Sequence, residues 1–584
     1  MYLPDSWRAG RGRSANHMVA GIGWDVGLPR RPEPGGKGVA LGLEDGVVAH
    51  RSSAARRMTD GANLSRLALA IGSGVLLALA FPPVGWAWLT PLAAAGLTWA
   101  CWGQRVRDGA LTGLAYGFGF FVVLLQWVRV IGVDGWLALS LLEAAFVAAL
   151  GAALAIVTRL RWWPVWAAAL WVGQELLRGS VPFGGFPWGR LVFALDDTPL
   201  ARLASVGGAS FVTFVAALAG NLLLWALLAR GRRLVPRLVA GLAAASLACG
   251  GLLVPTPTTG DGSATVAVVQ GNVPGRGLDF LGNARTVTRN HLEATEQLMR
   301  DVAAGLVPRP DFVIWPENST DLDPFVDQIT REVVERAVAT AGVPVLVGAV
   351  LHGPGPTYRR TTGVVWDPET GPGQIYVKQH PVPFGEYIPF RKLLLPLIQR
   401  LEQVGADTYA GSEPGFLRIA GYDVGDIICF EVAYDGLVQE LARLNPELLV
   451  VQTNNSTYLG TGQPEQQFAM TRLRAIEFGK TILVASPSGI SGVIAPDGTV
   501  VARSREATRE VFVERVPLRT APTLATRLGR VPEWVMTFVG LAALAVAWRR
   551  RERTKAEPPA PAGAGLPLGP ADRVPSTVDG GGRP

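Results

Sequence analysis

The sequence predicts a polytopic α-helical membrane domain, with about eight transmembrane helices, joined to an α/β domain. Of its 584 residues 49% are hydrophobic and 17% are charged, against about 25% charged in a typical soluble domain. Apolar runs close to the ~20 residues that a bilayer requires follow one another from Leu67 to Val254. Short apolar runs then alternate with amphipathic stretches, a pattern typical of α/β domains. This composition argues against a purely soluble enzyme and against a disordered chain.

Residues 1–62 are rich in Gly and Arg and show no sustained hydrophobic periodicity. We expect a disordered basic N-terminal tail, since such a segment has too few apolar side chains to build a core. It lacks the compact layout of a signal peptide. Met58 lies just before the first apolar run, so the sequence leaves open whether translation starts at Met1 or at Met58.

Seven apolar runs predict a transmembrane domain over residues 63–254. The predicted spans are 67–84, 86–103, 110–130, 136–157, 162–178, 208–229 and 236–254. Buried helices of a soluble protein are the alternative, which seven successive runs disfavour. An eighth span at 534–548, within the segment 532–550, has Trp534 and Trp548 at the expected interfaces. Residues 551–584 are Pro/Gly/Ala-rich, and we expect a disordered tail.

The arginines predict the orientation of these spans. They gather in the tail before the first span, in the loops after the second, fourth and sixth spans, and after the eighth span. They are Arg51, Arg56, Arg57 and Arg66; Arg105 and Arg107; Arg159 and Arg161; Arg230, Arg232, Arg233 and Arg237; and Arg549 to Arg553 with Lys555. The positive-inside rule then places both termini in the cytoplasm and residues 255–531 outside. The net charge of +7 is therefore interpreted as an orientation signal that also attracts anionic lipids, and no nucleic-acid partner is expected.

The external segment, residues 255–531, has the pattern of an α/β domain. We expect strands at 265–269, 312–314, 345–347, 427–429, 448–451 and 482–485. We expect helices at 284–304, 324–341 and 465–478. Pro496-Asp497-Gly498 lies between two apolar runs and predicts a hairpin.

The chain has three cysteines and no Cys/His cluster, so we expect neither a disulfide scaffold nor a metal site, and no cofactor. Cys101 and Cys249 lie within apolar spans and are interpreted as packing residues. Cys429 lies at a predicted strand end before a turn, where a nucleophile can be presented. A buried core cysteine is the alternative for this residue.

A cysteine nucleophile needs a base and an oxyanion stabiliser. Glu317 follows the predicted strand 312–314, and Lys378 ends a predicted strand at 374–377. Polar residues at strand ends can meet on one rim of a sheet. Spacing alone leaves open a papain-like pairing of His380 with Cys429, and each charge taken singly is also typical of a solvated surface.

Three motifs in this domain resemble a known signature. Trp315-Pro316-Glu317, Lys378 followed by Glu386 in Pro-Phe-Gly-Glu-Tyr-Ile-Pro, and Cys429-Phe430-Glu431 are similar to the Glu-Lys-Cys set of the carbon–nitrogen hydrolase (nitrilase) superfamily. With seven spans before this domain and one after it, the chain resembles the apolipoprotein N-acyltransferase family over about residues 65–548. Further similar motifs are Ala80-Phe81-Pro82-Pro83, Glu175-Leu176-Leu177-Arg178, Gly185-Phe186-Pro187-Trp188 and Gln270-Gly271-Asn272. The resemblance implies a nitrilase-like α-β-β-α sandwich over residues 255–531.

The resemblance also implies an acyltransferase of the bacterial cytoplasmic membrane. Glu317 would be the general base, Cys429 the nucleophile that forms a thioester, and Lys378 the oxyanion stabiliser together with the N–H after Cys429. Three secondary residues are Glu386, on a loop over the thioester, Glu431, which would orient Lys378 or Glu317, and Phe430. Structural ion pairs are the alternative for the two glutamates. The implied partners are a phospholipid acyl donor and the diacylglyceryl-modified N-terminal cysteine of an apolipoprotein.

The chain departs from the family pattern at three places. A tryptophan that is often found after the Gln-Gly-Asn motif is missing from Gly277-Leu278-Asp279-Phe280. The segment often written Asn-Asp-Ala-Trp-Phe-Gly reads Asn-Ser-Thr-Tyr-Leu-Gly at residues 455–460. Phe430 occupies a position where a tyrosine is common. These changes bear on substrate fit more than on the chemistry. The segment Phe186-Pro187-Trp188 is expected either to line the substrate entrance or to anchor the chain at the interface.

Two other functions remain open from the residues. A membrane-anchored amidohydrolase of the same superfamily would use water as the acyl acceptor, although an anchor needs only one span. A transporter or receptor would place ionisable groups within the spans, where only Glu143, Glu175 and Arg129 are candidates.

Overall fold

The computed structural model describes residues 63–229, 234–273, 275 and 285–556. The expectations for the tails at 1–62 and 557–584, for Arg230, Arg232 and Arg233, and for the departure at 277–280 lie outside these residues.

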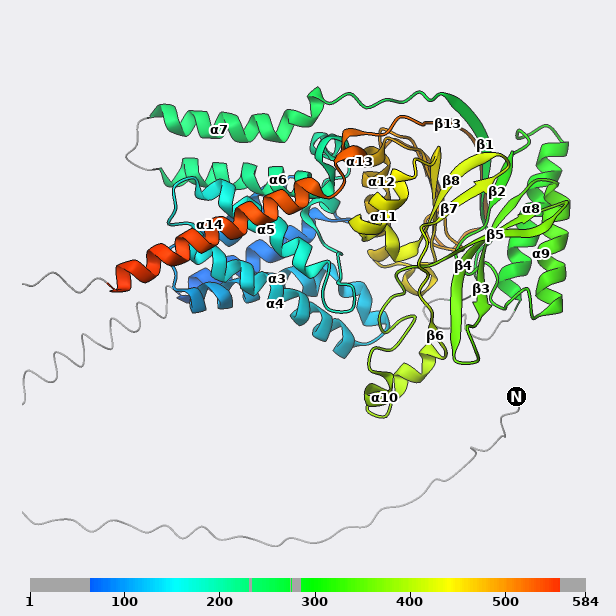
Figure 1. The fold of residues 1–584 in the computed structure, drawn as a ribbon, viewed down its shortest axis with the longest axis horizontal. Coiled ribbons are helices and arrows are strands. Elements are labelled where there is room, and N and C mark those ends of the chain that lie inside the picture. The colour runs from blue at the N-terminus through cyan, green and yellow to red at the C-terminus, as the bar shows by residue number, and fades with distance from the viewer. Residues whose placement is uncertain (1–62, 230–233, 274, 276–284, 557–584) are drawn as a thin grey trace, which may run out of the picture. The chain divides into compact units, whose positions relative to one another are not determined.

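Helices occupy the places where the eight spans were predicted (Figure 1). They are Asn63–Ala80, α2 (Leu89–Cys101), α3 (Val106–Leu124), α4 (Val133–Val157), α5 (Trp163–Arg178), α6 (Ala204–Leu228), α7 (Leu234–Cys249) and α14 (Val531–Ala556). Within the described residues, five segments are long and apolar enough to cross a membrane: Asn63–Ala80, Val133–Val157, Pro199–Leu228, Leu234–Leu253 and Val531–Arg553. The chain therefore has several apolar helices that are candidates for membrane spans.

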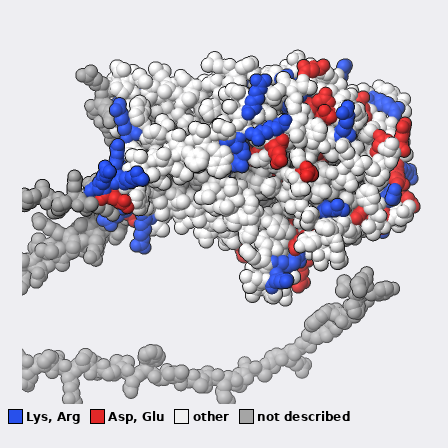
Figure 2. Space-filling view, in the orientation of Figure 1, with Lys and Arg blue, Asp and Glu red and all other residues white. Residues whose placement is uncertain are grey.

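Helix α14 continues beyond its predicted end at residue 548. Its last turns contain Arg, Glu and Lys, which are good helix formers, and Trp548 Nε1 donates a hydrogen bond to Glu552 at 2.7 Å. Lys and Arg gather at the end of the helical part where α14 ends, whereas the visible flank of these helices is almost free of charge (Figure 2). An apolar flank next to a basic end is what a segment in contact with lipid requires.

The α/β part contains two stacked sheets. The first has the strand order β13-β1-β2-β3-β4-β5, with β6 paired to β4. Its strands are β1 (Gly262–Gln270), β2 (Phe312–Ile314), β3 (Val345–His352), β4 (Tyr358–Asp367), β5 (Gly371–Val377), β6 (Asp407–Thr408) and β13 (Glu510–Leu518). The second has the order β12-β11-β10-β9-β8-β7. Its strands are β7 (Phe416–Ile419), β8 (Tyr422–Ile428), β9 (Leu448–Gln452), β10 (Ile482–Ala485), β11 (Gly492–Ile494) and β12 (Val500–Arg503), with the predicted Pro496-Asp497-Gly498 turn between the last two.

Helices cover the outer faces of both sheets (Figure 1). α8 (Thr286–Ala303) and α9 (Gln328–Ala341) pack on the first sheet. α11 (Asp435–Arg443) and α12 (Gln463–Phe478) pack on the second. Two short helices complete the domain, α10 (Arg391–Leu394) and α13 (Leu524–Leu528). Because the apolar residues of the two inner faces form one core, the domain is the expected α-β-β-α sandwich.

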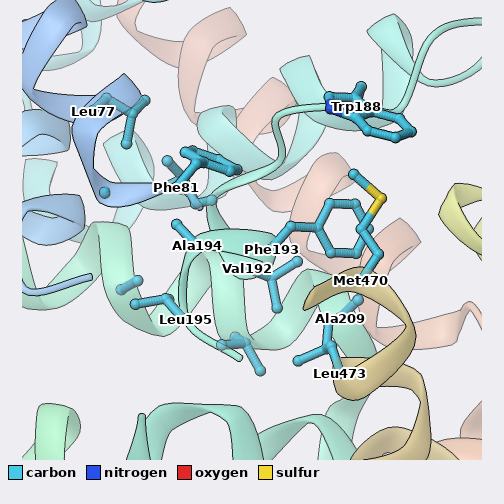
Figure 3. Packing of buried hydrophobic residues seen from close by; sticks show 14 of the residues in the cluster. Leu77, Phe81, Trp188, Val192, Phe193, Ala194, Leu195, Ala209, Met470 and Leu473 are labelled. Carbon is cyan, nitrogen blue, oxygen red and sulfur yellow. The ribbon is translucent and has the colours of Figure 1, made fainter. Parts of the chain in front are cut away.

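Helix α12 also packs against the membrane helices and their loops. Met470 and Leu473 of α12 lie beside Val192, Phe193 and Ala209 in one buried cluster (Figure 3). At the same junction Gln466 Oε1 accepts hydrogen bonds from Trp127 Nε1 at 3.2 Å and Trp188 Nε1 at 2.7 Å. The hydrophobic core is thus continuous between the helical part and the sandwich.

A buried arginine sits at this junction, directly behind the turn that carries Cys429. Arg474 is fully buried and pairs with Asp435 at 2.6 Å and Glu477 at 2.5 Å. Its Nε also donates to the Val432 carbonyl at 2.9 Å. Removing one partner from a buried ion pair leaves an uncompensated buried charge.

We therefore expect Arg474→Leu to destabilise the folded chain by about 3–5 kcal/mol. The matched control is Arg331→Leu, because Arg331 forms an exposed pair with Glu335 at 2.7 Å. That change should cost less than about 1 kcal/mol. Thermal unfolding of the purified protein in detergent measures both, and equal melting temperatures for the two variants would contradict this assignment.

Candidate active site

The residues predicted to act together meet at one rim of the sandwich. β1, β2 and β3 run parallel, and β5 runs in the same direction because two antiparallel pairings separate it from β3. β8 and β9 are parallel to each other in the second sheet. Glu317, Lys378 and Cys429 follow the carboxyl ends of β2, β5 and β8. Strand direction therefore brings together three residues that are far apart in the sequence.

Lys378 pairs with two carboxylates. Its Nζ lies 2.9 Å from Glu317 Oε1 and 2.9 Å from Glu386 Oε2. Lys378 is 1% exposed and Glu317 3% exposed, so this pairing is shielded from water. The Lys378 backbone N–H donates to the Thr361 carbonyl at 2.9 Å, which fixes the start of the segment after β5.

Cys429 is the first residue after β8 and adopts φ +58°, a left-handed conformation that a residue with a side chain seldom takes. The turn directs the sulfur toward Glu317, with which it hydrogen bonds. The Thr453 hydroxyl and the Asn454 N–H also hydrogen bond to this sulfur. Unlike Glu317 and Lys378, which are buried, Cys429 is partly exposed as a residue.

Burial and neighbouring charges shift the pKa values of Cys429, Glu317 and Lys378. Burial raises the pKa of the Cys429 thiol to about 12, and the Glu317 carboxylate adds to this effect while the Lys378 ammonium opposes it. Burial also raises the pKa of Glu317, against the stabilising charge of Lys378. Burial disfavours the charged form of Lys378, but Glu317 and Glu386 outweigh it and hold its pKa well above the usual value. At rest the lysine is therefore an ammonium, and the cysteine is a thiol that needs a base.

The two secondary carboxylates hold backbone in place. Glu386 Oε2 accepts from the Val382 N–H at 2.7 Å, which folds its own loop against Lys378. Glu431 does not orient Lys378 or Glu317 through a hydrogen bond, as one expectation held. It accepts from the Tyr376 hydroxyl at 2.8 Å and from three N–H groups, those of Ile428, Gln379 and His380. Glu431 thus ties the segment after Lys378 to the turn that carries Cys429.

In the segment Phe186-Pro187-Trp188, Pro187 lines a pocket together with His380 and Tyr434, whereas Trp188 is packed inside the protein rather than at an interface. Trp188 is 1% exposed, and its ring stacks on Phe430 with centroids 5.7 Å apart. Phe186 packs on the same ring at 5.5 Å. The cause is Arg178, whose guanidinium donates to the Phe186 carbonyl at 2.7 Å while pairing with Glu143 at 3.0 Å. Phe430 therefore lies between Cys429 and the helical part.

Other candidates lie outside the site. The His380 ring stacks on Tyr434 with centroids 4.4 Å apart, and its pKa is lowered by burial. Since the thiol hydrogen bonds to Glu317, the papain-like arrangement is not the one observed. Cys101 is buried as expected, but Cys249 is exposed on α7 and is not a packing residue. The ionisable groups Glu143 and Glu175 pair with Arg178 and Arg190.

Several polar residues near the site were not among those predicted from the sequence. Thr453 and Asn454 follow β9 directly, next to the end of β8, so the shared strand direction was the available signal. Asp426 is a lone charge at an inward position of an apolar strand, between Val424 and Ile428. Tyr376 and Gln452 carried no comparable signal, because their partners are distant in sequence.

An α-β-β-α sandwich with a buried Glu-Lys-Cys set at one rim defines a carbon–nitrogen hydrolase domain, and the family model with that description matches residues 265–525. Residues 73–223 match the model described as the apolipoprotein N-acyltransferase N-terminal domain. The apolipoprotein N-acyltransferase of Mycolicibacterium smegmatis is 36% identical, with 89% of this chain and 90% of that protein covered. That of Methylococcus capsulatus is 31% identical, with 84% and 97% covered. The chain therefore belongs to the apolipoprotein N-acyltransferase family.

Among solved structures, a nitrilase-superfamily amidase from Nesterenkonia is 17% identical to this chain, with a TM-score of 0.33. The match covers 45% of this chain and 93% of the amidase.

One glycine permits the close approach that positions Glu317. A Cβ on Gly348 of β3 would lie 2.0 Å from the Pro316 carbonyl oxygen and 2.8 Å from Glu317 Cα. Both of those groups are backbone, so neither can move aside without displacing the strand end. A Cβ on Gly373 of β5 would instead meet only the Val365 carbonyl at 3.6 Å.

We expect Gly348→Ala to displace Glu317 from Cys429 and to slow lipoprotein N-acylation by about tenfold or more, since an ångström of misplacement can cost about 100-fold. Gly373→Ala is the control and should react like the wild type. The rate of N-acylation of a lipoprotein peptide measures both, and a Gly348→Ala variant with an unchanged rate would rule out this positioning role.

Proposed function

We propose that the chain transfers a fatty acyl chain from a membrane phospholipid, through a thioester on Cys429, to the α-amino group of the S-diacylglyceryl N-terminal cysteine of apolipoproteins. The observation that carries the proposal is the buried contact of Glu317 with both Lys378 and Cys429. Membership of the acyltransferase family supports the reaction class.

In the first half-reaction Glu317 takes the thiol proton as the Cys429 sulfur attacks the donor ester carbonyl. A carboxylate base is needed because a thiol whose pKa is raised to about 12 does not ionise by itself near neutrality. The tetrahedral intermediate then collapses. Its carbon–oxygen bond breaks, the lysophospholipid oxygen takes the proton back from Glu317, and the acyl group remains on sulfur as a thioester.

Lys378 serves as the oxyanion stabiliser, together with the Phe430 N–H at the start of the turn after Cys429. Its raised pKa keeps it an ammonium, so it cannot act as the base. When Glu317 becomes protonated, it loses its negative charge and attracts the Lys378 ammonium less strongly. The ammonium can then interact with the new oxyanion. Glu386 keeps the ammonium in place during this exchange. A preorganised donor of this kind lowers the free energy of the transition state by about 3–4 kcal/mol.

In the second half-reaction the acceptor amine attacks the thioester carbonyl, and Glu317 takes the amine proton. Collapse of the intermediate breaks the carbon–sulfur bond and returns the proton to the Cys429 thiolate. The product is an amide, which is more stable than the thioester. With an amide as the acyl donor and water as the acceptor, the same site would be an amidohydrolase.

An exposed aromatic cluster supports access from lipid. Phe183 packs against Phe384 and Phe390 with centroids 6.4 Å and 5.8 Å apart, and the three rings are 44%, 43% and 68% exposed. Phe384 lies two residues before Glu386, so the cluster adjoins the loop that contacts Lys378. Exposed apolar side chains beside a site fit a substrate with acyl chains.

The proposal places all eight helices in the bacterial cytoplasmic membrane. Both termini would lie in the cytoplasm, and the sandwich, residues 255–531, would lie outside. The arginines at the ends of the helices support this orientation, including those at the end of α14. The amine of a lipidated N-terminal cysteine would then reach the Cys429 rim at the outer membrane surface.

The decisive test incubates the purified protein with labelled phospholipid and then determines the mass of the peptide that contains Cys429. We expect one fatty-acyl mass on that peptide in the wild type, none in Cys429→Ser, and an unchanged signal in the control Cys101→Ser. Addition of a diacylglyceryl peptide should remove the label and yield an N-acylated peptide.

Release of ammonia or acid from a soluble amide, without N-acylation of the peptide, would instead favour the amidohydrolase. A wild type that never carries the acyl mass would overturn the proposed donor and intermediate.

A further inference from the structure

Two buried polar side chains lie between the sheets, close to the site but outside the mechanism above. Asp426 of β8 and Gln452 of β9 are both 0% exposed. Both carboxylate oxygens of Asp426 and the amide oxygen Oε1 of Gln452 lack a hydrogen-bond partner among the described residues. Unsatisfied buried acceptors are costly, so three at one place need an explanation.

The two side chains occupy the same space above Gly363 of β4. A Cβ on Gly363 would lie 2.2 Å from Asp426 Oδ2 and 2.7 Å from Gln452 Oε1. The absence of a side chain at Gly363 is therefore what makes room for the pair in an otherwise apolar inter-sheet core.

The orientation of the Gln452 amide follows from its other contact. Gln452 Nε2 donates to the Trp315 carbonyl oxygen, which can only accept. If the amide were flipped, Gln452 Oε1 would face the Trp315 carbonyl oxygen, and two acceptors would meet without a hydrogen between them. Gln452 Oε1 must therefore face Asp426, where a carboxylate would oppose it with a second acceptor and no hydrogen between them.

We propose that Asp426 is a neutral carboxylic acid whose proton is donated to Gln452 Oε1, so that Asp426 holds Gln452 and, through the Trp315 carbonyl, positions Glu317. One proton converts a repulsive contact between two acceptors into a hydrogen bond. Glu317 is two residues beyond Trp315, so the chain of contacts ends on the proposed base. Asp426 is a positioning residue, and its effect on the reaction rests on the proposed function.

The surrounding charges favour the neutral acid. Burial raises the pKa of Asp426 well above its usual value, and the carboxylates of Glu431 and Glu317 raise it further. The Ile427 N–H opposes this shift, and Tyr376 is the other titratable group in contact range. The nearby ammonium of Lys378 already pairs with Glu317 and Glu386, so it offers Asp426 no matching charge.

The test uses two variants whose side chains branch at Cγ as that of Asp426 does. Asp426→Asn keeps a donor for Gln452 Oε1, whereas Asp426→Leu removes it. Infrared difference spectra between wild type and Asp426→Asn, recorded near neutral pH, should contain a carboxylic-acid C=O band that the variant lacks. This readout does not depend on acyl transfer, so its failure is distinct from failure of the proposed function.

The acylation rate of Cys429 supplies the second readout. Asp426→Asn should stay within about threefold of wild type, and Asp426→Leu should be slower by about tenfold or more, the scale of one unsatisfied buried hydrogen-bonding group. Gln452→Met should slow the reaction similarly, and its combination with Asp426→Leu should add little, because both changes break one chain of contacts.

A missing acid band would overturn the proposal. So would an Asp426→Asn variant as slow as Asp426→Leu, or an Asp426→Leu variant as fast as the wild type. If Asp426→Leu fails to fold, the infrared band and the comparison of Asp426→Asn with Gln452→Met still decide the matter.

Discussion

The site depends on one buried ammonium shared by two carboxylates beside a sulfur. Lys378 contacts Glu317 and Glu386 at the same distance, 2.9 Å, and its charge opposes the rise that burial causes in the pKa of Glu317. Because Glu317 also hydrogen bonds to Cys429, transfer of a single proton between them would alter both the thiol and the carboxylate that pairs with the ammonium. The proposed base, nucleophile and oxyanion stabiliser are therefore electrostatically coupled.

The helical part supports this arrangement from behind. Phe430, next to Cys429, packs on Phe186 and Trp188, and Trp188 donates to Gln466 of α12. Arg474, on the same helix, bonds to the Val432 carbonyl in the turn that carries Cys429. Helix α12 of the sandwich therefore packs in one hydrophobic cluster with the helical part. This packing fixes the position of the rim that carries Cys429 relative to the helices.

The sequence predicted the parts of this structure that depend on local patterns. Apolar runs located the helices, and strand ends located Glu317, Lys378 and Cys429, because parallel strands present their carboxyl ends at one rim. Contacts between distant segments could not be read in this way. The burial of Trp188 follows from Arg178, and the contacts of Glu431 come from four donors on two segments, residues 376–380 and Ile428. The environment of Asp426 becomes visible only when Gln452 is seen beside it.

The most direct test of the shared ammonium is the stability of variants that remove charges singly and together. Lys378→Met leaves Glu317 and Glu386 buried without their cation, and it should lower the melting temperature strongly. The triple variant Glu317→Gln, Lys378→Met, Glu386→Gln removes all three charges and should recover most of that loss, although it should be inactive. A Lys378→Met protein as stable as the wild type, or a triple variant no more stable than Lys378→Met, would contradict the account.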